Sequence, residues 1–584
     1  MRYPSKRLGG VFVTLAVASI LVAACSKTPT DNDGGTQASP GFAECVAKPN
    51  DCNSGPRANG GTLTFVLEQD MAAWHPNAAS GTHFGSAQVL NSVYPAPFTV
   101  LPNYDIVLNT DLMVSAEETK KDPQTVVWKI QPNAVWSDGT PITAKDFLFN
   151  LWTFDGKTCT ADQGCTPAAT SGFDQITEAT ASDNDKTVTT VFAQPYPDWK
   201  SLFQLLPAHI AQSQGGWNGT KEDAAGLGKA FKYFIDNQPT VSGGPYLIDK
   251  FEKGVAVTQV KNPKWYGAEK PTLDKLVWRL IEEQSALVPA ARNKEINALY
   301  PQPNADLVTQ VKGLDGFHYY LAPGMSWEHV DLNTKNAALS DKALRQAIQT
   351  AIDRTEIISK TVGVMDPSIK PLGHHVFVPG VKGYQDNVGP LGFGAGNIDK
   401  ATSILTAAGY RIDNGKLIGK DGKPVPTLRF RHTVGNKLRG DTAALIQQQL
   451  KKIGVDIKIE TTDKLSSTLD SGDYDIILFA WVTSPFVGTT LKDLWGTGSG
   501  QNYNKYSNPQ YDAIANEAGR TVDKDKFINL VNQGDAILAE DAVTLPLFQR
   551  LNLIVVDKRY ANVRNNGTNL GPAYNAQQWG LKAN

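Results

Sequence analysis

The sequence predicts an α/β fold, because segments with the apolar period of helices alternate with strand-like segments along the chain. Apolar residues at helical spacing follow Ser340-Asp341-Lys342 and continue to Ile352. Two further segments, 397–408 and 442–453, show the same spacing, and each is followed by a glycine that can end a helix. The length of the chain exceeds what one hydrophobic core can organise, so we expect at least two domains.

Two strand-like segments follow the last of these helices. Residues 455–459 have strand composition, and residues 475–481 form an apolar run that is typical of a strand buried in the centre of a parallel sheet. Ligand-binding loops lie at the carboxyl ends of such strands. The loop from Trp481 to Gly488 is therefore expected to face a ligand.

The first 25 residues resemble the export signal of a bacterial lipoprotein. A basic head precedes an uncharged run over 11–24, which is shorter than the ~20 residues that span a bilayer and fits a secretion signal. Small residues directly before Cys25 resemble a lipobox, which implies that residues 1–24 are removed and that the Cys25 thiol is acylated. An ordinary signal peptide with a chance cysteine is the alternative.

Residues 25–59 are predicted to be a flexible tether that follows the lipid anchor. This segment is rich in Thr, Pro, Asp, Asn, Gly and Ser and has few large apolar residues. Strand composition begins at residues 62–67, so we expect the folded body to start near residue 60. No later segment approaches 18 uncharged apolar residues, and no second membrane crossing is expected.

Composition and charge are those of a globular protein with little affinity for nucleic acid. The chain is 41% hydrophobic and 20% charged, with 56 Lys and Arg against 58 Asp and Glu. Without the three basic residues of the signal, 53 basic residues face 58 acidic ones, a net charge of −5. Nucleic-acid binding requires clustered Lys and Arg, so we expect no nucleic-acid partner.

Four cysteines other than Cys25 suggest disulfides, because an exported protein meets an oxidising compartment. Their short spacings favour Cys45–Cys52 and Cys159–Cys165 among the three connectivities. Neither spacing fits a Cys-x-x-Cys zinc or redox site.

Seven sequence blocks carry a family resemblance over nearly the whole mature chain. They are Trp128-Lys129-Ile130 with 135–147, Ser242-Gly243-Gly244-Pro245-Tyr246, 261–266, 339–354, 407–410, Gly472-Asp473-Tyr474-Asp475 and 502–509. In this order they resemble the family 5 extracellular solute-binding proteins, which serve oligopeptide, dipeptide and nickel ABC importers. The blocks themselves are expected to build the fold, with a helix capped by Thr143 and with glycine dihedrals at Gly243-Gly244.

The resemblance implies a two-lobed, periplasmic-binding-protein-like clamshell with an inserted subdomain and two hinge crossings. Lobe I would comprise residues 60–90, 238–328 and 548–584, the subdomain residues 91–237, and lobe II residues 329–547. Ligand would be captured as the lobes close. It would then be passed to ABC permease and ATPase subunits by a monomeric, lipid-anchored receptor outside the cytoplasm.

The resemblance also implies where the ligand lies. In peptide binders of this family, a carboxylate three residues beyond the strand tryptophan commonly pairs with the ammonium of the peptide. Ser484 occupies that position here, and a hydroxyl cannot neutralise a buried ammonium. Oligopeptide is the expected ligand, with an oligosaccharide or another organic solute as alternatives. The candidate ligand-binding residues are Asp70, Trp74, His75, Tyr94, Trp481, Thr483, Ser484, Phe486, Tyr503 and Asn504.

We find no catalytic motif, so we expect a binding protein; a signalling receptor or an enzyme with the same fold is the alternative. Gly-x-Ser-x-Gly, Ser-x-x-Lys and His-Glu-x-x-His are absent from the sequence. His374-His375 lies in a Pro- and Gly-rich segment without a third ligand nearby in sequence. We therefore expect no metal site and no cofactor.

Overall fold

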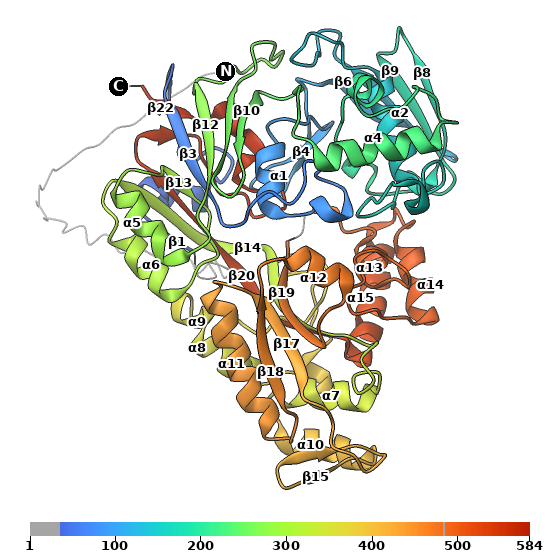
Figure 1. The fold of residues 1–584 in the computed structure, drawn as a ribbon, viewed down its shortest axis with the longest axis vertical. Coiled ribbons are helices and arrows are strands. Elements are labelled where there is room, and N and C mark those ends of the chain that lie inside the picture. The colour runs from blue at the N-terminus through green and yellow to red at the C-terminus, as the bar shows by residue number, and fades with distance from the viewer. Residues whose placement is uncertain (1–35, 483–484, 584) are drawn as a thin grey trace, which may run out of the picture. The chain divides into compact units, whose positions relative to one another are not determined.

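A computed structural model describes residues 36–482 and 485–583, and these described residues form one compact unit (Figure 1). Among the described residues, the largest sheet has eleven strands, in the order β10-β11-β12-β3-β13-β20-β14-β19-β17-β18 with β1 paired to β14. The strands are β1 Gln37–Ala38, β3 Thr62–Leu67, β10 Tyr246–Glu252, β11 Ala256–Lys261, β12 Lys275–Leu280, β13 Ala298–Leu299, β14 Phe317–Leu332, β17 Leu428–Thr433, β18 Ile457–Thr462, β19 Ile476–Val482 and β20 Thr544–Asp557. Helices alternate with these strands in sequence, so the predicted α/β class is confirmed.

Two long strands, β14 and β20, carry the chain between two lobes. They pair antiparallel along most of their length, and the second half of β14 also pairs with β19. Figure 1 shows both strands running from the upper to the lower part of the ribbon. The predicted lobe boundaries, after residues 328 and 547, both fall inside these strands. The two-lobed fold thus has two crossings made of paired backbone.

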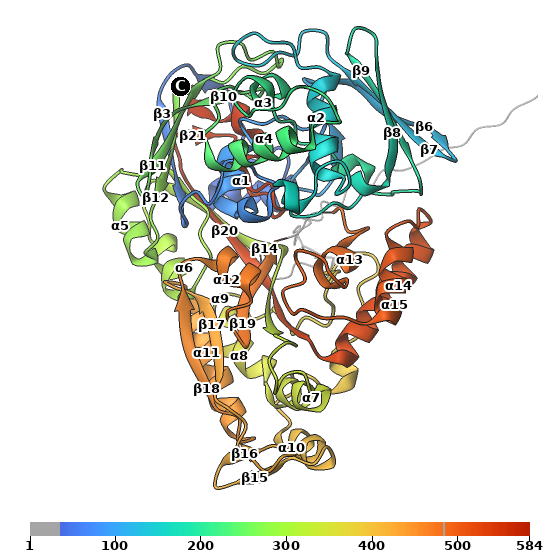
Figure 2. The same ribbon diagram turned by 45° about the vertical axis from the view of Figure 1, so that its right-hand side comes forward.

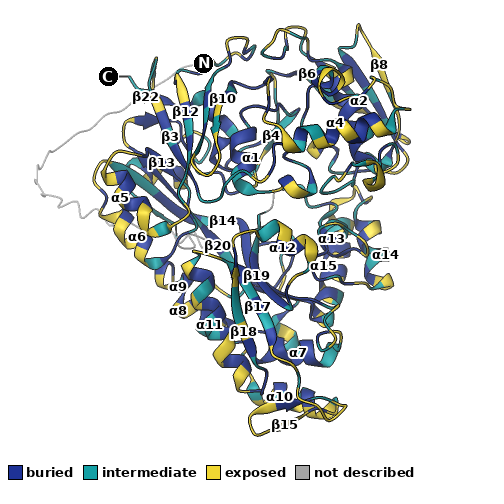
Figure 3. Ribbon diagram, in the orientation of Figure 1, coloured by how far each residue is buried: buried dark blue, intermediate teal, exposed yellow. Residues whose placement is uncertain are grey.

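Lobe I also contains short elements around β3 and the C-terminal segment. They are β2 Arg57–Ala58, α1 Phe84–Leu90, α5 Leu287–Arg292, α6 Ala305–Lys312, β21 Tyr560–Ala561 and β22 Gly580–Lys582. The paired short strands β4 Phe98–Val100 and β5 Ile106–Leu108 fall within residues 91–237, the range predicted for the subdomain. Figure 3 shows that buried residues concentrate on the inner strands of the sheet, while helix faces turned outward are exposed.

A separate four-stranded antiparallel sheet, in the order β6-β7-β9-β8, and three helices form the inserted subdomain (Figure 2). These elements are β6 Met113–Lys121, β7 Gln124–Ile130, β8 Ile176–Ser182, β9 Thr187–Phe192, α2 Ala144–Phe154, α3 Ala208–Ser213 and α4 Ala224–Asp236. The predicted cap at Thr143 is confirmed. Its hydroxyl accepts the Lys145 amide at 3.3 Å, and the Asp146 carboxylate accepts the Thr143 amide at 2.8 Å. This reciprocal capping box fixes the start of α2.

Lobe II contains the predicted helices, with one corrected start. Its other elements are α7 Lys342–Ala351, α8 Arg354–Lys360, α9 Val362–Met365, α10 Ile398–Ala407, β15 Arg411–Asp413, β16 Lys416–Ile418, α11 Lys437–Lys451, α12 Leu465–Ser471, α13 Thr490–Trp495, α14 Pro509–Ala518 and α15 Lys524–Asp541. The predicted start of α11 at residue 442 was wrong, because Asn436 caps the helix by accepting the Arg439 amide at 3.1 Å. The first turn of α11 has few apolar residues, so the apolar spacing did not reveal it. Its Arg439 is buried in an ion pair with Glu328, at 3.1 Å.

The prediction that residues 475–481 lie in a parallel sheet was wrong in one respect. Strand β19 pairs parallel with β17 but antiparallel with β14. It is buried along its first half because both of its edges are paired within the mixed sheet.

The predicted flexible tether was wrong over residues 36–58, which are ordered on lobe I. Strand β1 pairs with β14, the Phe42 side chain is 1% exposed, and the Arg564 guanidinium donates to the Cys52 carbonyl at 2.7 Å. The buried Phe42 ring and the Cys45–Cys52 disulfide hold this polar segment in place. The polar composition of the segment gave no sign of this order. The structure joins Cys45 to Cys52 and Cys159 to Cys165.

The prediction that Gly243-Gly244 needs glycine dihedrals was also wrong. Neither residue has a positive φ. Close approach excludes a side chain instead, because a Cβ on Gly244 would lie 2.2 Å from the Ser92 carbonyl oxygen. Three hydrogen bonds to the Val93 carbonyl fix this approach. The Ser242 hydroxyl and the Gly243 and Gly244 amides each donate to it at 3.0 Å.

Candidate ligand-binding cavity

A cavity of about 690 Å³ lies where lobe I, the subdomain and lobe II meet. Its lining residues come from five parts of the chain, within 77–111, 150–204, 244–265, 486–493 and 569–578. Loops and the short strands β4 and β5 supply most of them. Its volume is within the roughly 300–1,000 Å³ range of small-ligand sites.

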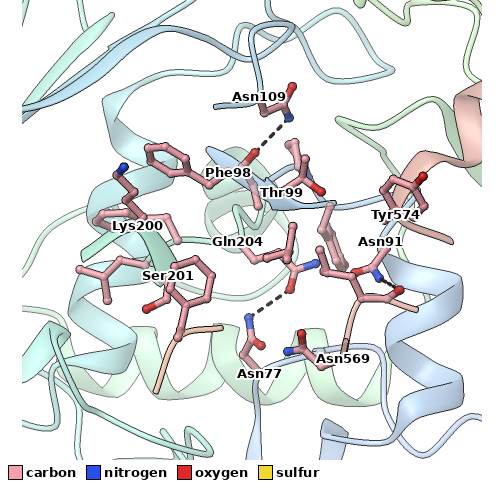
Figure 4. A pocket seen from close by; sticks show the side chains of 18 of the residues that line it. Asn77, Asn91, Phe98, Thr99, Asn109, Lys200, Ser201, Gln204, Asn569 and Tyr574 are labelled. Atoms are coloured by element: carbon pink, nitrogen blue, oxygen red, sulfur yellow. Dashed lines mark hydrogen bonds between the residues drawn. The ribbon is translucent and has the colours of Figure 1, made fainter. Parts of the chain in front are cut away.

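Primary amides dominate the polar part of the cavity wall (Figure 4). The Asn77 amide donates to Gln204 Oε1 at 3.1 Å. The Asn109 amide donates to the Ala96 carbonyl at 3.0 Å, and the Asn91 amide donates to the Leu570 carbonyl at 3.0 Å. These bonds orient the side chains, and each amide keeps further donor or acceptor capacity. The wall therefore offers neutral hydrogen-bonding groups in fixed directions.

Aromatic side chains form the apolar part of the wall. Phe98 and Tyr574 come from opposite ends of the sequence and both line the cavity (Figure 4). The Lys200 ammonium lies 5.6 Å from the centre of the Phe98 ring, a cation–π contact. Such faces can receive apolar side chains or sugar rings.

The charged residues of the lining are mainly acidic. Asp111, Asp198 and Asp493 are the lining carboxylates, whereas Lys200 is the one lining cation among the described residues. Burial raises the pKa of Asp198 to about 6; the Gly488 amide opposes this rise and the Asp493 charge adds to it. Burial also raises the pKa of Asp493, against hydrogen bonds from the Ser171 and Thr489 hydroxyls. The lining thus disfavours a ligand with several negative charges.

The family is decided by a match over the middle of the chain. The family model described as "Bacterial extracellular solute-binding proteins, family 5 Middle" matches residues 108–503, which is more than half of the sequence. The chain belongs to this family. The predicted resemblance is confirmed.

Relatives of this solute-binding protein extend the match to nearly its full length. The oligopeptide-binding protein OppA of Mycobacterium tuberculosis is 29% identical over 513 residues, which cover 86% of this chain and 82% of OppA. The solved periplasmic EDTA-binding protein EppA is 33% identical with a TM-score of 0.84, covering 92% of this chain and 99% of EppA. The solved oligopeptide-binding protein AppA of Bacillus subtilis, in complex with a nonapeptide, is 21% identical with a TM-score of 0.77. AppA is matched over 90% of this chain and all of its own, and it has the same fold.

Two of the candidate residues named from the sequence, Tyr94 and Phe486, line the cavity of this solute-binding protein. Thr483 and Ser484 lie outside the described residues, as does Cys25. The Asp70 carboxylate accepts the Met71 amide at 2.8 Å and the Gly254 amide at 3.1 Å, so it ties two loops together.

Trp74 and His75 lie within the apolar core of lobe I and the subdomain. The Trp74 ring packs edge-on against Phe251 at 5.0 Å between centres. The His75 ring lies 4.4 Å from Phe231 and is 1% exposed, and burial lowers the pKa of His75 to about 3. His75 is therefore a neutral core residue in this structure.

Trp481, Tyr503 and Asn504 lie together in lobe II. The Trp481 and Tyr503 rings stack at 5.6 Å with 9° between their planes, and the buried His329 ring lies parallel to Trp481 at 6.0 Å. The Asn504 amide donates to the Val543 carbonyl at 2.9 Å. This aromatic group packs the end of β19, and Trp481 retains partial exposure beside the loop.

The fold brings one carboxylate, Asp535, beside the His374-His375 pair. Asp535 Oδ1 lies 2.8 Å from His375 Nδ1 and 3.3 Å from His374 Nδ1. However, His374 Nδ1 accepts the Val376 and Phe377 amides, at 2.9 and 3.0 Å. Within the described ranges, no group of three or more His, Cys, Asp or Glu is arranged to hold a metal ion. The same part of the chain contains no helix that is long and apolar enough to cross a membrane.

The sequence did not indicate the residues that give the cavity its chemistry. Asn77, Asp198, Gln204 and Asn569 stand in loops and Asp493 stands in α13, without a shared motif. The family block over 135–147 lies in the subdomain, which supplies part of the cavity wall. None of the block's own residues, all within the described part of the chain, lines the cavity. Only the folding of distant segments brings the lining together.

Proposed function

We propose that this chain is the substrate-binding lipoprotein of an ABC importer, and that it captures oligopeptides between its lobes and delivers them to a membrane permease. Membership of the solute-binding family supports a receptor that is outside the cytoplasm. The mycobacterial relative named as an oligopeptide-binding protein, matched over 82% of its length, supports a peptide ligand.

The main support for a peptide ligand is the composition of the cavity wall. The wall combines oriented amide side chains with aromatic faces and a net acidic charge. Amide side chains can pair with peptide N–H and carbonyl groups without selecting one sequence. Aromatic faces accommodate varied apolar side chains. Carboxylates in the wall favour a ligand with an ammonium group over a polyanion.

This charge argument separates the chain from its structural relative EppA, which is named for binding EDTA. EDTA and its metal complexes carry several carboxylate groups, and the wall here offers Lys200 against three aspartates. We therefore place oligopeptide ahead of EDTA-like ligands. A neutral oligosaccharide is the second candidate, because amides and aromatic rings also suit sugar hydroxyls and ring faces.

Native mass spectrometry of the full-length protein, incubated with a tryptic digest of casein, tests the proposed ligand class. We expect peptide adducts, and no adduct with EDTA or maltooligosaccharides at the same concentration. The matched variants are Thr99→Trp, which places a large side chain on a cavity wall, and Thr177→Trp on the exposed face of β8. Thr99→Trp should lose the peptide adducts and Thr177→Trp should keep them. Preferential binding of EDTA or of the oligosaccharide would contradict the proposal.

The anchor and the mode of action belong to the same proposal. Residues 1–24 act as a signal peptide, and the acylated Cys25 holds a monomeric receptor at the outer face of the cell membrane. The ABC permease and ATPase subunits are its partners. The receptor performs no chemistry on its ligand, in keeping with relatives that are named as binding proteins.

A further inference from the structure

Direct polar contacts join the subdomain to lobe II at one end of the cavity. The Gly488 amide donates to Asp198 Oδ2 at 2.5 Å. The Lys492 ammonium lies 3.2 Å from Asp174 Oδ2. The Ser171 hydroxyl donates to Asp493 Oδ1. Each contact links residues about 300 positions apart in sequence, on either side of the two crossings.

The two sides of this contact belong to different packed bodies. On the lobe II side, Leu491 packs into the apolar cluster that also contains Tyr511, and the Tyr511 hydroxyl donates to the Leu491 carbonyl at 2.8 Å. On the subdomain side, Phe173 packs against Phe203, with ring centres 5.3 Å apart. The lobe II cluster and the subdomain cluster share no residue within the described part of the chain. A polar interface without a common apolar core can open without breaking either core.

The same contact lies at the cavity, because Ser171, Asp198 and Asp493 are among its lining residues. Opening the contact would therefore open the cavity at that end. The two long strands that cross between the lobes supply the hinge at the other side of the interface.

We propose that these contacts form an interlobe latch that holds the cavity closed and slows ligand release; its residues are Ser171, Asp174, Asp198, Gly488, Lys492 and Asp493. The inserted subdomain is then the part of the receptor that locks onto lobe II. The proposal rests on the proposed function only for the identity of the ligand, since closure itself can be measured without one.

Hydrogen exchange of the full-length, ligand-free protein tests the latch directly. Asp198→Ala removes the acceptor of the Gly488 amide, and Lys492→Ala removes the ion pair. The matched control is Lys526→Ala, which removes an ion pair of 2.8 Å to Glu517 within lobe II. We expect exchange in residues 486–495 to become at least fivefold faster in both latch variants and to stay unchanged in the control. Unchanged protection of the α14 amides will show that lobe II remains folded.

Release of casein tryptic peptides gives a second, separate measurement. Peptides should leave both latch variants several-fold faster than they leave the wild type and Lys526→Ala. Exchange that does not change in the latch variants overturns the latch even if casein peptides bind and the proposed function holds. Faster exchange in both latch variants supports the latch even if no peptide binds and the proposed function fails.

Discussion

Replacing Glu328 with Gln tests the buried ion pairs that join the crossing strands to lobe II. Glu328 on β14 is 1% exposed, and its carboxylate accepts hydrogen bonds from two nitrogens of Arg439, Nε and Nη2, each with a shortest distance of 3.1 Å. Arg550 Nε on β20 lies 3.3 Å from the same carboxylate. Burial by itself would raise the pKa of Glu328, but the charges of Arg439 and Arg550 outweigh it and hold the pKa below its ordinary value.

The expected loss of stability follows from the charges that stay behind. Gln keeps the shape and one acceptor of Glu328 but removes the carboxylate that pairs directly with both arginines, which are 3% and 8% exposed. Removing one partner of a buried ion pair costs about 3–5 kcal/mol. Asp525→Asn is the matched control, because Asp525 pairs with Lys382 at the surface, where both side chains are at least 75% exposed. Its effect should stay below about 1 kcal/mol.

Urea denaturation of the full-length variants, with linear extrapolation to water, measures both effects. A loss below about 1 kcal/mol in Glu328→Gln would refute the reasoning, because the arginines would then have found other compensation. The pH dependence provides an independent check. A carboxyl with a lowered pKa in the folded state stabilises the protein above its unfolded pKa, and that contribution disappears as the pH falls through the folded pKa. The difference between wild type and Glu328→Gln should therefore shrink below about pH 4.

Four further outcomes are expected. Cys25→Ala should abolish lipidation, and incorporation of labelled fatty acid into this variant would contradict the predicted anchor. Cys159 and Cys165 should resist iodoacetamide under denaturing, non-reducing conditions, whereas alkylation of both would exclude their disulfide. Gly244→Ala should cost at least about 2 kcal/mol in urea denaturation, because its Cβ would meet a backbone carbonyl, and a neutral result would contradict that close contact. Burial raises the pKa of Asp198 to about 6 in the closed arrangement and also raises the pKa of Asp493, so closure should weaken and peptide release should quicken as the pH rises from about 4 to above 6. Asp198→Asn should reduce this pH dependence of peptide release, and an unchanged dependence would contradict the role of Asp198.

The sequence by itself determined the elements whose signals are local. The helix spacing after Asp341 and the cap at Thr143 depend on residues within a few positions, and both appear where they were predicted. The family blocks likewise indicated two lobes, because they resemble, in order, the segments of a family that has this fold. The ordered segment over 36–58 was missed, because its few apolar residues gain their burial from lobe I rather than from one another.

Only the tertiary structure decided the chemistry of the cavity. Phe98 and Tyr574 stand more than 470 positions apart, and Asp198 meets the Gly488 amide across the two lobes. A loop residue carries no periodic signal, since neither helix nor strand geometry fixes where it points. The raised pKa of Asp198 has the same origin: this carboxylate, between Pro197 and Trp199 in sequence, loses much of its solvent only when the fold brings Gly488 and Asp493 of lobe II beside it. Local sequence thus set the framework, and long-range packing set the charge and shape presented to a ligand.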